Sequence, residues 1–399
     1  MHTPALPTSR TVGTMTMSRE TQPPEHRSAA VIQTGRQDGP VIERVVVSAY
    51  RIPTDYPEAD GTLDWDHTTL VLVEASAENH TGVGFTYADT ATARLVTQSL
   101  IDVVRGRPAM AVTHCWHAML HELRNLGRPG VASMAVAAVD AALWDLKARL
   151  LHVPLVTLLG AVREAAPVYG SGGFTSYSIK QLEEQLAGWV EAGIPRVKMK
   201  VGRNPAEDAV RVEAARRAIG ERAELFVDAN GAYSRKQALG LAEQFSGCAV
   251  TWFEEPVSSD DLEGLGLLRN RAPAPIEIAA GEYGYDQVYF RRMLEAGAVD
   301  VLQADASRCA GITGFLQVGV QCEARSLPLS AHCAPSLHVH AACAVQPLRH
   351  IEYFHDHVRI ERMLFDGALT PIEGRIRPDL SRPGAGLEFK HQDAQRYEL

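Results

Sequence analysis

The amino-acid sequence predicts an α/β protein in which a βα barrel follows a smaller domain of strands and helices. Beyond Pro154, short runs rich in β-branched and apolar residues alternate with amphipathic helical stretches such as residues 205–220. The eight runs recur at intervals of about 22 to 29 residues, enough for one strand, one helix and two loops. They begin at Pro167, Arg196, Leu225, Val250, Ile276, Val299, Leu327 and Arg349. An open doubly wound sheet is the competing arrangement, but no GxGxxG turn follows the first run.

Residues 41–160 predict the smaller α+β domain. Two apolar runs, VIERVVV and TTLVLVE, are typical of strands, and a polar loop from Pro53 to Thr68 separates them. Helical periodicity follows at residues 94–124 and 131–150. This domain would pack against one end of the barrel.

We assign residues 161–365 to the barrel. Residues 366–399 are rich in glycine and proline, and we expect them to form a C-terminal segment that returns to the smaller domain. Residues 1–40 are polar and lack apolar periodicity, so we expect a flexible N-terminal tail.

The composition excludes several classes of partner. The chain of 399 residues is 46% hydrophobic, which is enough for a large core, and its net charge of -9 without a basic stripe argues against nucleic acid. The longest apolar stretch, residues 131–146, contains Asp140 and Asp145 and predicts a buried helix, not a membrane span. Six scattered cysteines show neither a disulfide framework nor a zinc knuckle, so we expect a cytoplasmic protein.

Polar side chains stand at the ends of the predicted strands. In a βα barrel the carboxyl ends of the strands meet at one pocket, which is where catalytic groups lie. Every run from the second onward ends in charged or hydrogen-bonding residues. They are Lys198 and Lys200, Asp228 and Asn230, Glu254 and Glu255, Glu282, Asp305, His332, and Glu352.

Three of these residues predict a metal site. Asp228, Glu254 and Glu282 belong to neighbouring strands, which lie about 4.8 Å apart, so their carboxylates can converge. Oxygen ligands favour Mg²⁺, with Mn²⁺ as the alternative, over zinc. Salt bridges from the carboxylates to the two lysines are the competing explanation. Asn230 would point to the same side as Asp228 and could bind substrate.

Two lysines and a histidine are candidates for proton transfer. Lys198 and Lys200 share one face of a strand, about 6.6 Å apart, and with a metal dication nearby we expect mutual repulsion to allow one of them to be a neutral base near neutral pH. Asp305 and His332 lie on adjacent strands, where the carboxylate would orient the imidazole as a general base. Glu352 faces the same pocket and could donate a hydrogen bond to substrate if protonated.

The sequence resembles a known family at these same positions. The motifs are AVAAVDAALWDLKAR (135–149), KMK, LFVDAN, WFEEP, AAGE, QADASRCAGITG and SAHCAPSLH. Together they resemble the mandelate racemase-like subgroup of the enolase superfamily, over nearly the whole chain after Val41. The resemblance implies an α+β capping domain over a (β/α)7β barrel of the TIM type, and a homo-oligomer.

The resemblance also implies roles for the candidate residues. Magnesium would be held by Asp228, Glu254 and Glu282. One acid/base would be Lys200, and the other His332 paired with Asp305. Lys198 would contact the substrate carboxylate, and Asn230 and Glu352 would stabilise its charge. The muconate-lactonizing branch would carry a lysine in place of Asp305, which argues against that branch.

The expected reaction begins with removal of the proton α to a carboxylate, for which the enolase superfamily uses a Lys or His base with metal ions. Dehydration of a sugar acid to a 2-keto-3-deoxy acid is favoured, because the loop from Tyr50 to His67 is rich in Asp, Tyr and Thr. Tyr56 and Tyr87 are the candidate substrate contacts there. Racemisation of an α-hydroxy acid is the alternative, and a binding protein without turnover is a third.

Overall fold

The small domain is a three-stranded antiparallel sheet packed against a long helix. The computed structural model describes residues 39–399. Strands β1 (Arg44–Ala59), β2 (Asp64–Ala77) and β3 (His80–Tyr87) pair in that order, and helix α4 (Val131–Leu150) covers β2 and β3. All but the last two residues of the predicted tail lie outside the described part of the chain.

A close approach between β3 and α4 explains two glycines and the alanine-rich helix. A Cβ atom at Gly82 or Gly84 would lie 2.2 to 2.3 Å from backbone atoms of α4. Only glycine fits at such a contact. The shorter elements α1 (Thr90–Leu95), η1 (Val96–Leu100), α2 (Ile101–Val104), α3 (Val112–Glu122) and η2 (Leu123–Asn125) complete the domain.

The predicted polar loop between Pro53 and Thr68 is wrong in its secondary structure. Strands β1 and β2 continue through most of it, with a register shift between Pro53 and Glu58. A two-stranded ribbon that projects from its sheet has little apolar surface to bury, so its polar sequence did not indicate strands. The irregular connection is limited to the few residues between Ala59 and Asp64.

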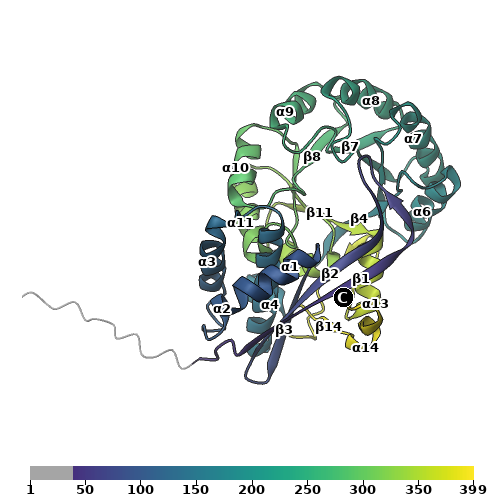
Figure 1. Ribbon diagram of the computed structural model, residues 1–399. Helices are drawn as coiled ribbons and strands as arrows, with labels where there is room; N and C mark the ends of the chain where they lie inside the picture. The colour runs from purple at the N-terminus through teal and green to yellow at the C-terminus, as the bar shows by residue number, and fades with distance from the viewer. Residues whose placement is uncertain (1–38) are drawn as a thin grey trace, which may run out of the picture. The chain divides into compact units, whose positions relative to one another are not determined.

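The hairpin of β1 and β2 reaches the carboxyl ends of the barrel strands. A Cβ atom at Gly61, in its tip, would lie 2.5 Å from the carbonyl oxygen of Ala229 and 2.8 Å from that of Val201. Asp64 forms an ion pair with Arg203, which follows strand β5. Figure 1 shows the two strands running from the small domain to the side of the barrel near α6 and α7.

All eight predicted barrel strands form, and the sheet closes by pairing of its last strand with its first. The strands are β4 (Ala166–Gly172), β5 (Arg196–Lys200), β6 (Glu224–Asp228), β7 (Val250–Glu254), β8 (Glu277–Ala280), β9 (Val301–Ala304), β10 (Leu329–Ala331) and β11 (Leu348–Phe354). Seven connections carry helices on the outside (Figure 1). These are α6 (Ile179–Glu191), α7 (Pro205–Ile219), α8 (Arg235–Gly247), α9 (Leu262–Arg271), α10 (Gln287–Glu295), α11 (Gly311–Glu323) and α12 (Pro335–Ala342). The predicted (β/α)7β barrel is therefore confirmed.

The C-terminal segment contacts the small domain. Its elements are α13 (His355–Leu364), β12 (Phe365–Asp366), β13 (Arg375–Ile376), β14 (Glu388–Phe389), α14 (His391–Ala394) and η3 (Gln395–Tyr397), and α5 (Leu155–Leu159) joins α4 to the barrel. The backbone N–H of Leu399 donates to the carbonyl of Ala49, and Arg149 of α4 pairs with Glu388. Within residues 39–399, no helix is long and apolar enough to cross a membrane.

Candidate active site

A cavity of about 290 Å³ lies where the hairpin meets the carboxyl ends of the barrel strands. The small domain contributes Trp65, His67, Thr68 and Tyr87, among others, and the barrel contributes Lys200, Asn230, Glu282, Arg308, His332, Cys333 and Glu352. Five of the ten strand-end residues predicted from the sequence thus line one cavity, and the small domain supplies its opposite wall.

The three predicted metal ligands converge. Asp228 and Glu254 end β6 and β7, and Glu282 follows β8 by two residues. One carboxylate oxygen from each lies within 4.8 Å of the others, and the side chains are at most 3% exposed. Among residues 39–399, Oε2 of Glu282 is buried without a hydrogen-bond partner of regular geometry, and Nε2 of His332 lies 3.2 Å from it. An all-carboxylate donor set with such an oxygen fits a hard divalent cation.

Salt bridges between these carboxylates and the lysines, the competing explanation, also form. Nζ of Lys198 lies 2.5 Å from Glu254 and 3.1 Å from Asp228, and Nζ of Lys200 lies 2.5 Å from Asp228. These bridges do not balance the charge. Lys198, Lys200 and Arg308 face five buried carboxylates, and His332, whose pKa is raised, can supply a fourth positive charge, so at least one negative charge remains. The carboxylates are Asp228, Glu254, Glu282, Asp305 and Glu352. A dication would neutralise the charge that remains.

The predicted neutral lysine depends on a nearby dication and stays a prediction; without the cation, both lysines favour their charged form. Burial lowers the pKa of Lys200, but the carboxylate of Asp228 outweighs this effect and raises the pKa above its ordinary value. Lys198 shifts in the same direction, because Glu254 and Glu352 outweigh its burial and raise its pKa. The sequence argument counted the repulsion between the two lysines but not these ion pairs. A dication at the carboxylates would act in the opposite direction, since like charges disfavour protonation.

The predicted pairing of Asp305 and His332 is present. Each residue directly follows its strand, β9 or β10, and Nδ1 of His332 lies 2.8 Å from Oδ2 of Asp305. Burial lowers the pKa of His332, but neighbouring acidic groups, first Cys333 and then Glu282, raise it well above its ordinary value. Burial raises the pKa of Asp305, but the hydrogen bond with His332 lowers it below its ordinary range. The pair therefore favours a charged carboxylate beside a basic imidazole.

Glu352 and Asn230 both line the cavity. Burial raises the pKa of Glu352, but Lys198, 2.8 Å away, outweighs burial and lowers the pKa below its ordinary value. This ion pair favours the charged carboxylate, and the substrate contact of Glu352 stays a prediction. Asn230 adopts a left-handed backbone conformation, φ 46°, and its side-chain Oδ1 is buried without a partner. That amide is free to meet a ligand.

Of the other predicted substrate contacts, Tyr87 lines the cavity, whereas Tyr56 and Lys198 do not. Tyr87 is buried, lines the cavity and stacks on His357 with ring centroids 3.6 Å apart. Tyr56 is 55% exposed and packs on Tyr177 outside the cavity, so the structure does not bring it to the site. Lys198 is fully buried beneath the cavity, among carboxylates and over the ring of Tyr169, and its substrate contact stays a prediction.

Trp65 and Arg308 are among the cavity residues that the sequence did not predict, whereas His357 was considered as a substrate contact but expected in an exposed loop. Trp65 comes from the hairpin, where its indole N–H donates to Glu58 over 2.8 Å. Arg308 reaches both Glu282 and Asp305, at 3.5 and 3.7 Å. His357 is buried in the first turn of α13, and its burial lowers its pKa to about 3, so it is neutral. Arg308 lies three residues beyond Asp305, and this spacing could have indicated the ion pair between them.

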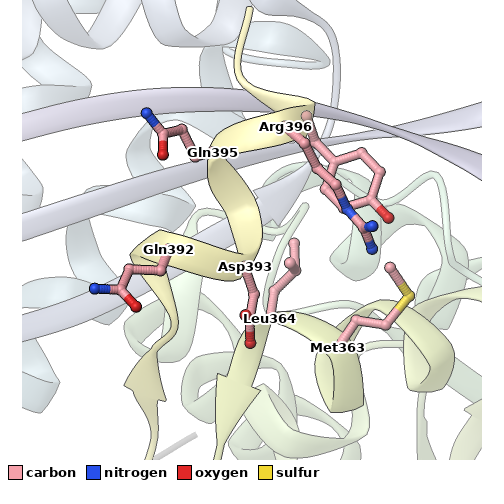
Figure 2. A pocket seen from close by; sticks show the side chains of 7 residues that line it. Met363, Leu364, Gln392, Asp393, Gln395 and Arg396 are labelled. Atoms are coloured by element: carbon pink, nitrogen blue, oxygen red, sulfur yellow. The ribbon is translucent and has the colours of Figure 1, made fainter.

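A larger hollow of about 540 Å³ is lined by residues of a different chemical kind. It is formed by α13 and the C-terminal segment, and Figure 2 shows Gln392, Gln395 and Arg396 around it. Among its seven lining residues only Asp393 carries a carboxylate, and none carries an imidazole or a thiol. It offers no set of groups for catalysis.

A capping domain over a (β/α)7β barrel, with three converging carboxylates between a lysine and a histidine, defines the class of protein. Residues 45–160 match the family model "Mandelate racemase / muconate lactonizing enzyme, N-terminal domain", and residues 181–394 match "Enolase C-terminal domain-like". The chain belongs to the mandelate racemase/muconate lactonizing enzyme family of the enolase superfamily.

Three relatives illustrate the similarity. A mandelate racemase/muconate lactonizing enzyme-like protein from Rubrobacter xylanophilus is 55% identical, with a TM-score of 0.89 over 90% of this chain and 100% of that one. A 3,6-anhydro-α-L-galactonate cycloisomerase from Streptomyces coelicolor is 32% identical over 87% of this chain and 96% of its own. L-talarate/galactarate dehydratase from Salmonella typhimurium is 30% identical over 95% and 96%. Its structure with Mg and L-lyxarohydroxamate has a TM-score of 0.84, at 28% identity, and covers 92% of this chain and 95% of that one.

Proposed function

We propose that the protein is a magnesium-dependent dehydratase of a sugar acid. The observation that carries the proposal is that Lys200 and His332 line one cavity, and that the strands which position them, β5 and β10, lie on either side of β6, β7 and β8 in the barrel order. Related proteins of similar length include dehydratases named for talarate, galactarate, rhamnonate and galactonate, which supports a substrate of this class.

The cluster of Asp228, Glu254 and Glu282 would hold the cation. When bound, Mg²⁺ neutralises the second negative charge that develops on the substrate carboxylate as its α proton leaves. The buried Asn230 amide, whose Oδ1 has no protein partner, would help to orient the same substrate.

Two groups would move protons. Lys200, which lines the cavity, would accept the α proton through Nζ in its neutral form, which a cation at the carboxylates favours. His332, held through Nδ1 by Asp305, donates a proton from Nε2 to the departing β-hydroxyl, which leaves as water. The resulting enol then becomes the 2-keto-3-deoxy acid. The acidic groups around His332 raise its pKa, which favours the protonated imidazole that this role requires.

The cavity wall favours a polyhydroxylated substrate. Asp60, His67, Thr68 and Thr69 bring hydroxyl, imidazole and carboxylate groups from the small domain. An aryl substrate would need an apolar wall in the same place. The polar wall therefore supports a sugar acid over a mandelate-like acid.

A deuterium experiment tests the proposed function. The protein is incubated with Mg²⁺ in deuterated water and a panel of sugar acids and α-hydroxy acids. We expect a keto acid to accumulate from at least one sugar acid. No conversion and no deuterium uptake across the panel would contradict the proposal.

Racemisation or epimerisation is the second candidate. It is favoured by the same pair, because Lys200 could remove a proton and His332 could return one from the other side of the α carbon. Deuterium uptake without net loss of water would identify it. The expected homo-oligomer and the expected cytoplasmic location stay predictions. The six free cysteines support a reducing compartment such as the cytoplasm.

A further inference from the structure

A second set of potential metal ligands lies on the Nε2 side of His332. Nε2 is 3.3 Å from Sγ of Cys333 and 3.5 Å from Oε2 of Glu352, and these two atoms are 3.3 Å apart. Oε2 of Glu282 lies 3.2 Å from the same Nε2, so this set is adjacent to the proposed magnesium ligands. The three donors form a nearly equilateral triangle. None of the three belongs to the carboxylate cluster of Asp228, Glu254 and Glu282.

The size and chemistry of this triangle fit zinc. Bond lengths of about 2.3 Å to sulfur and about 2.0–2.2 Å to nitrogen and oxygen, at tetrahedral angles, separate neighbouring donors by about 3.4–3.6 Å. The edges of the triangle agree with these separations to within about 0.3 Å. Imidazole and thiolate are donors that Zn²⁺ prefers and Mg²⁺ avoids. The triangle therefore resembles one face of a zinc tetrahedron.

The surrounding structure holds the donors in place. Asp305 accepts from Nδ1 of His332, which leaves the lone pair of Nε2 for a metal, as in carboxylate–histidine–zinc arrangements. The backbone N–H of Cys333 donates to Oε2 of Glu352 over 3.1 Å, with Cys333 in a left-handed conformation, φ 52°. All three side chains are at most 4% exposed, yet they line the cavity. The fourth position of a bound zinc ion would be open to that cavity.

We propose that His332, Cys333 and Glu352 form a zinc-binding site, separate from the magnesium ligands, that inhibits the enzyme when it is filled. Binding breaks the S–H bond of Cys333 and, where Nε2 of His332 is protonated, its N–H bond. Each proton goes to solvent, and the thiolate and the Nε2 lone pair bind the metal. The lone pair of Nε2 is then engaged, so His332 can neither accept nor donate a proton. No change of oxidation state is involved.

Cobalt absorption tests the site without any substrate. The full-length protein, saturated with Mg²⁺, is titrated with Co²⁺, and thiolate coordination is read as a charge-transfer band in the near ultraviolet. We expect the band in the wild type and its loss on addition of Zn²⁺. Cys333→Ser should abolish it. Cys248→Ser is the matched control, because Cys248 is the one of the six cysteines that is not buried, and it should keep the band. Absence of the band, or its persistence in Cys333→Ser, would overturn the proposal.

Two further measurements separate the site from its consequences. If Cys333→Ser fails to fold, zinc anomalous scattering from wild-type crystals decides, since a peak away from the triangle would refute the site. For inhibition, Cys333→Ser should need at least about tenfold more Zn²⁺ than wild type, since even an outer-shell loss weakens metal sites by that factor. Equal sensitivity would refute inhibition through this site. The inhibition assay rests on the proposed dehydratase activity, whereas the cobalt band does not, so the two failures are distinguishable.

Discussion

Nδ1 of His332 lies 2.8 Å from Oδ2 of Asp305, so the imidazole is fixed through one nitrogen and presents the other to the cavity. This relationship joins two strand ends that are 27 residues apart in the chain. It determines which atom of His332 can exchange a proton with a substrate.

Replacement of His332 should abolish dehydration. In His332→Asn no group can protonate the leaving hydroxyl, and we expect the keto-acid rate to fall by about 10²–10⁴-fold. Deuterium exchange at the α carbon should persist through Lys200. The measurement is keto-acid formation alongside exchange in deuterated water. Full dehydratase turnover by this variant would remove His332 from the mechanism.

Replacement of Lys200 should separate the two faces of the substrate. Lys200→Ala removes the Nζ group that contacts Asp228, and we expect kcat for dehydration to fall by about 10²-fold or more. Slow exchange from the His332 side should remain. Lys236→Ala, at an exposed lysine of α8, is the control and should match the wild type. Equal rates for the two variants would contradict a role for Lys200.

Removal of the metal should remove activity without unfolding the protein. EDTA treatment is expected to reduce turnover by at least about a hundredfold, since a cation contributes several kcal/mol to stabilisation of the charge. Readdition of Mg²⁺ should restore it. Asp228→Asn should resist this restoration, whereas Asp260→Asn, at an exposed aspartate, should not. Turnover that survives complete chelation would contradict the assignment of the carboxylate cluster.

The buried Asp140 should make the stability of the fold depend on pH. Its carboxylate accepts two hydrogen bonds from Thr313, but burial dominates and raises its pKa to about 7. Because the pKa of Asp140 is higher in the folded state than in the unfolded state, protonation of this carboxyl favours folding. This contribution is complete below about pH 4 and is lost as the pH rises toward 7. Thermal unfolding between pH 5 and 8 measures the loss. Asp140→Asn, which cannot titrate, should show a flatter profile, and an unchanged profile would rule out Asp140 as the source.

The barrel and its strand-end residues could be predicted because their signals are local. Each barrel strand is a short apolar run, and a polar residue at its end must face the shared pocket whatever its neighbours are, which is why Asp228, Glu254, Glu282, Asp305 and His332 were found. Their order along the chain also gives their order around the barrel.

The parts that were missed depend on contacts between distant segments. The hairpin of β1 and β2 is polar because it projects over the barrel mouth, and its sequence did not show which side chains enter the cavity. Trp65 lines the cavity although it was not predicted, and Tyr56 was predicted but lies outside it. The charge states of Lys200 and Glu352 depend on which ion pairs form in three dimensions, and residue spacing does not reveal these. The repulsion between Lys198 and Lys200 affects the pKa of Lys200 less than the carboxylate of Asp228 does.

The most direct test is a crystal structure of the protein with Mn²⁺ and a bound sugar acid. We predict one anomalous peak among the carboxylates of Asp228, Glu254 and Glu282, with Nζ of Lys200 and Nε2 of His332 on opposite faces of the substrate α carbon. A peak elsewhere, or both groups on the same face, would contradict the account.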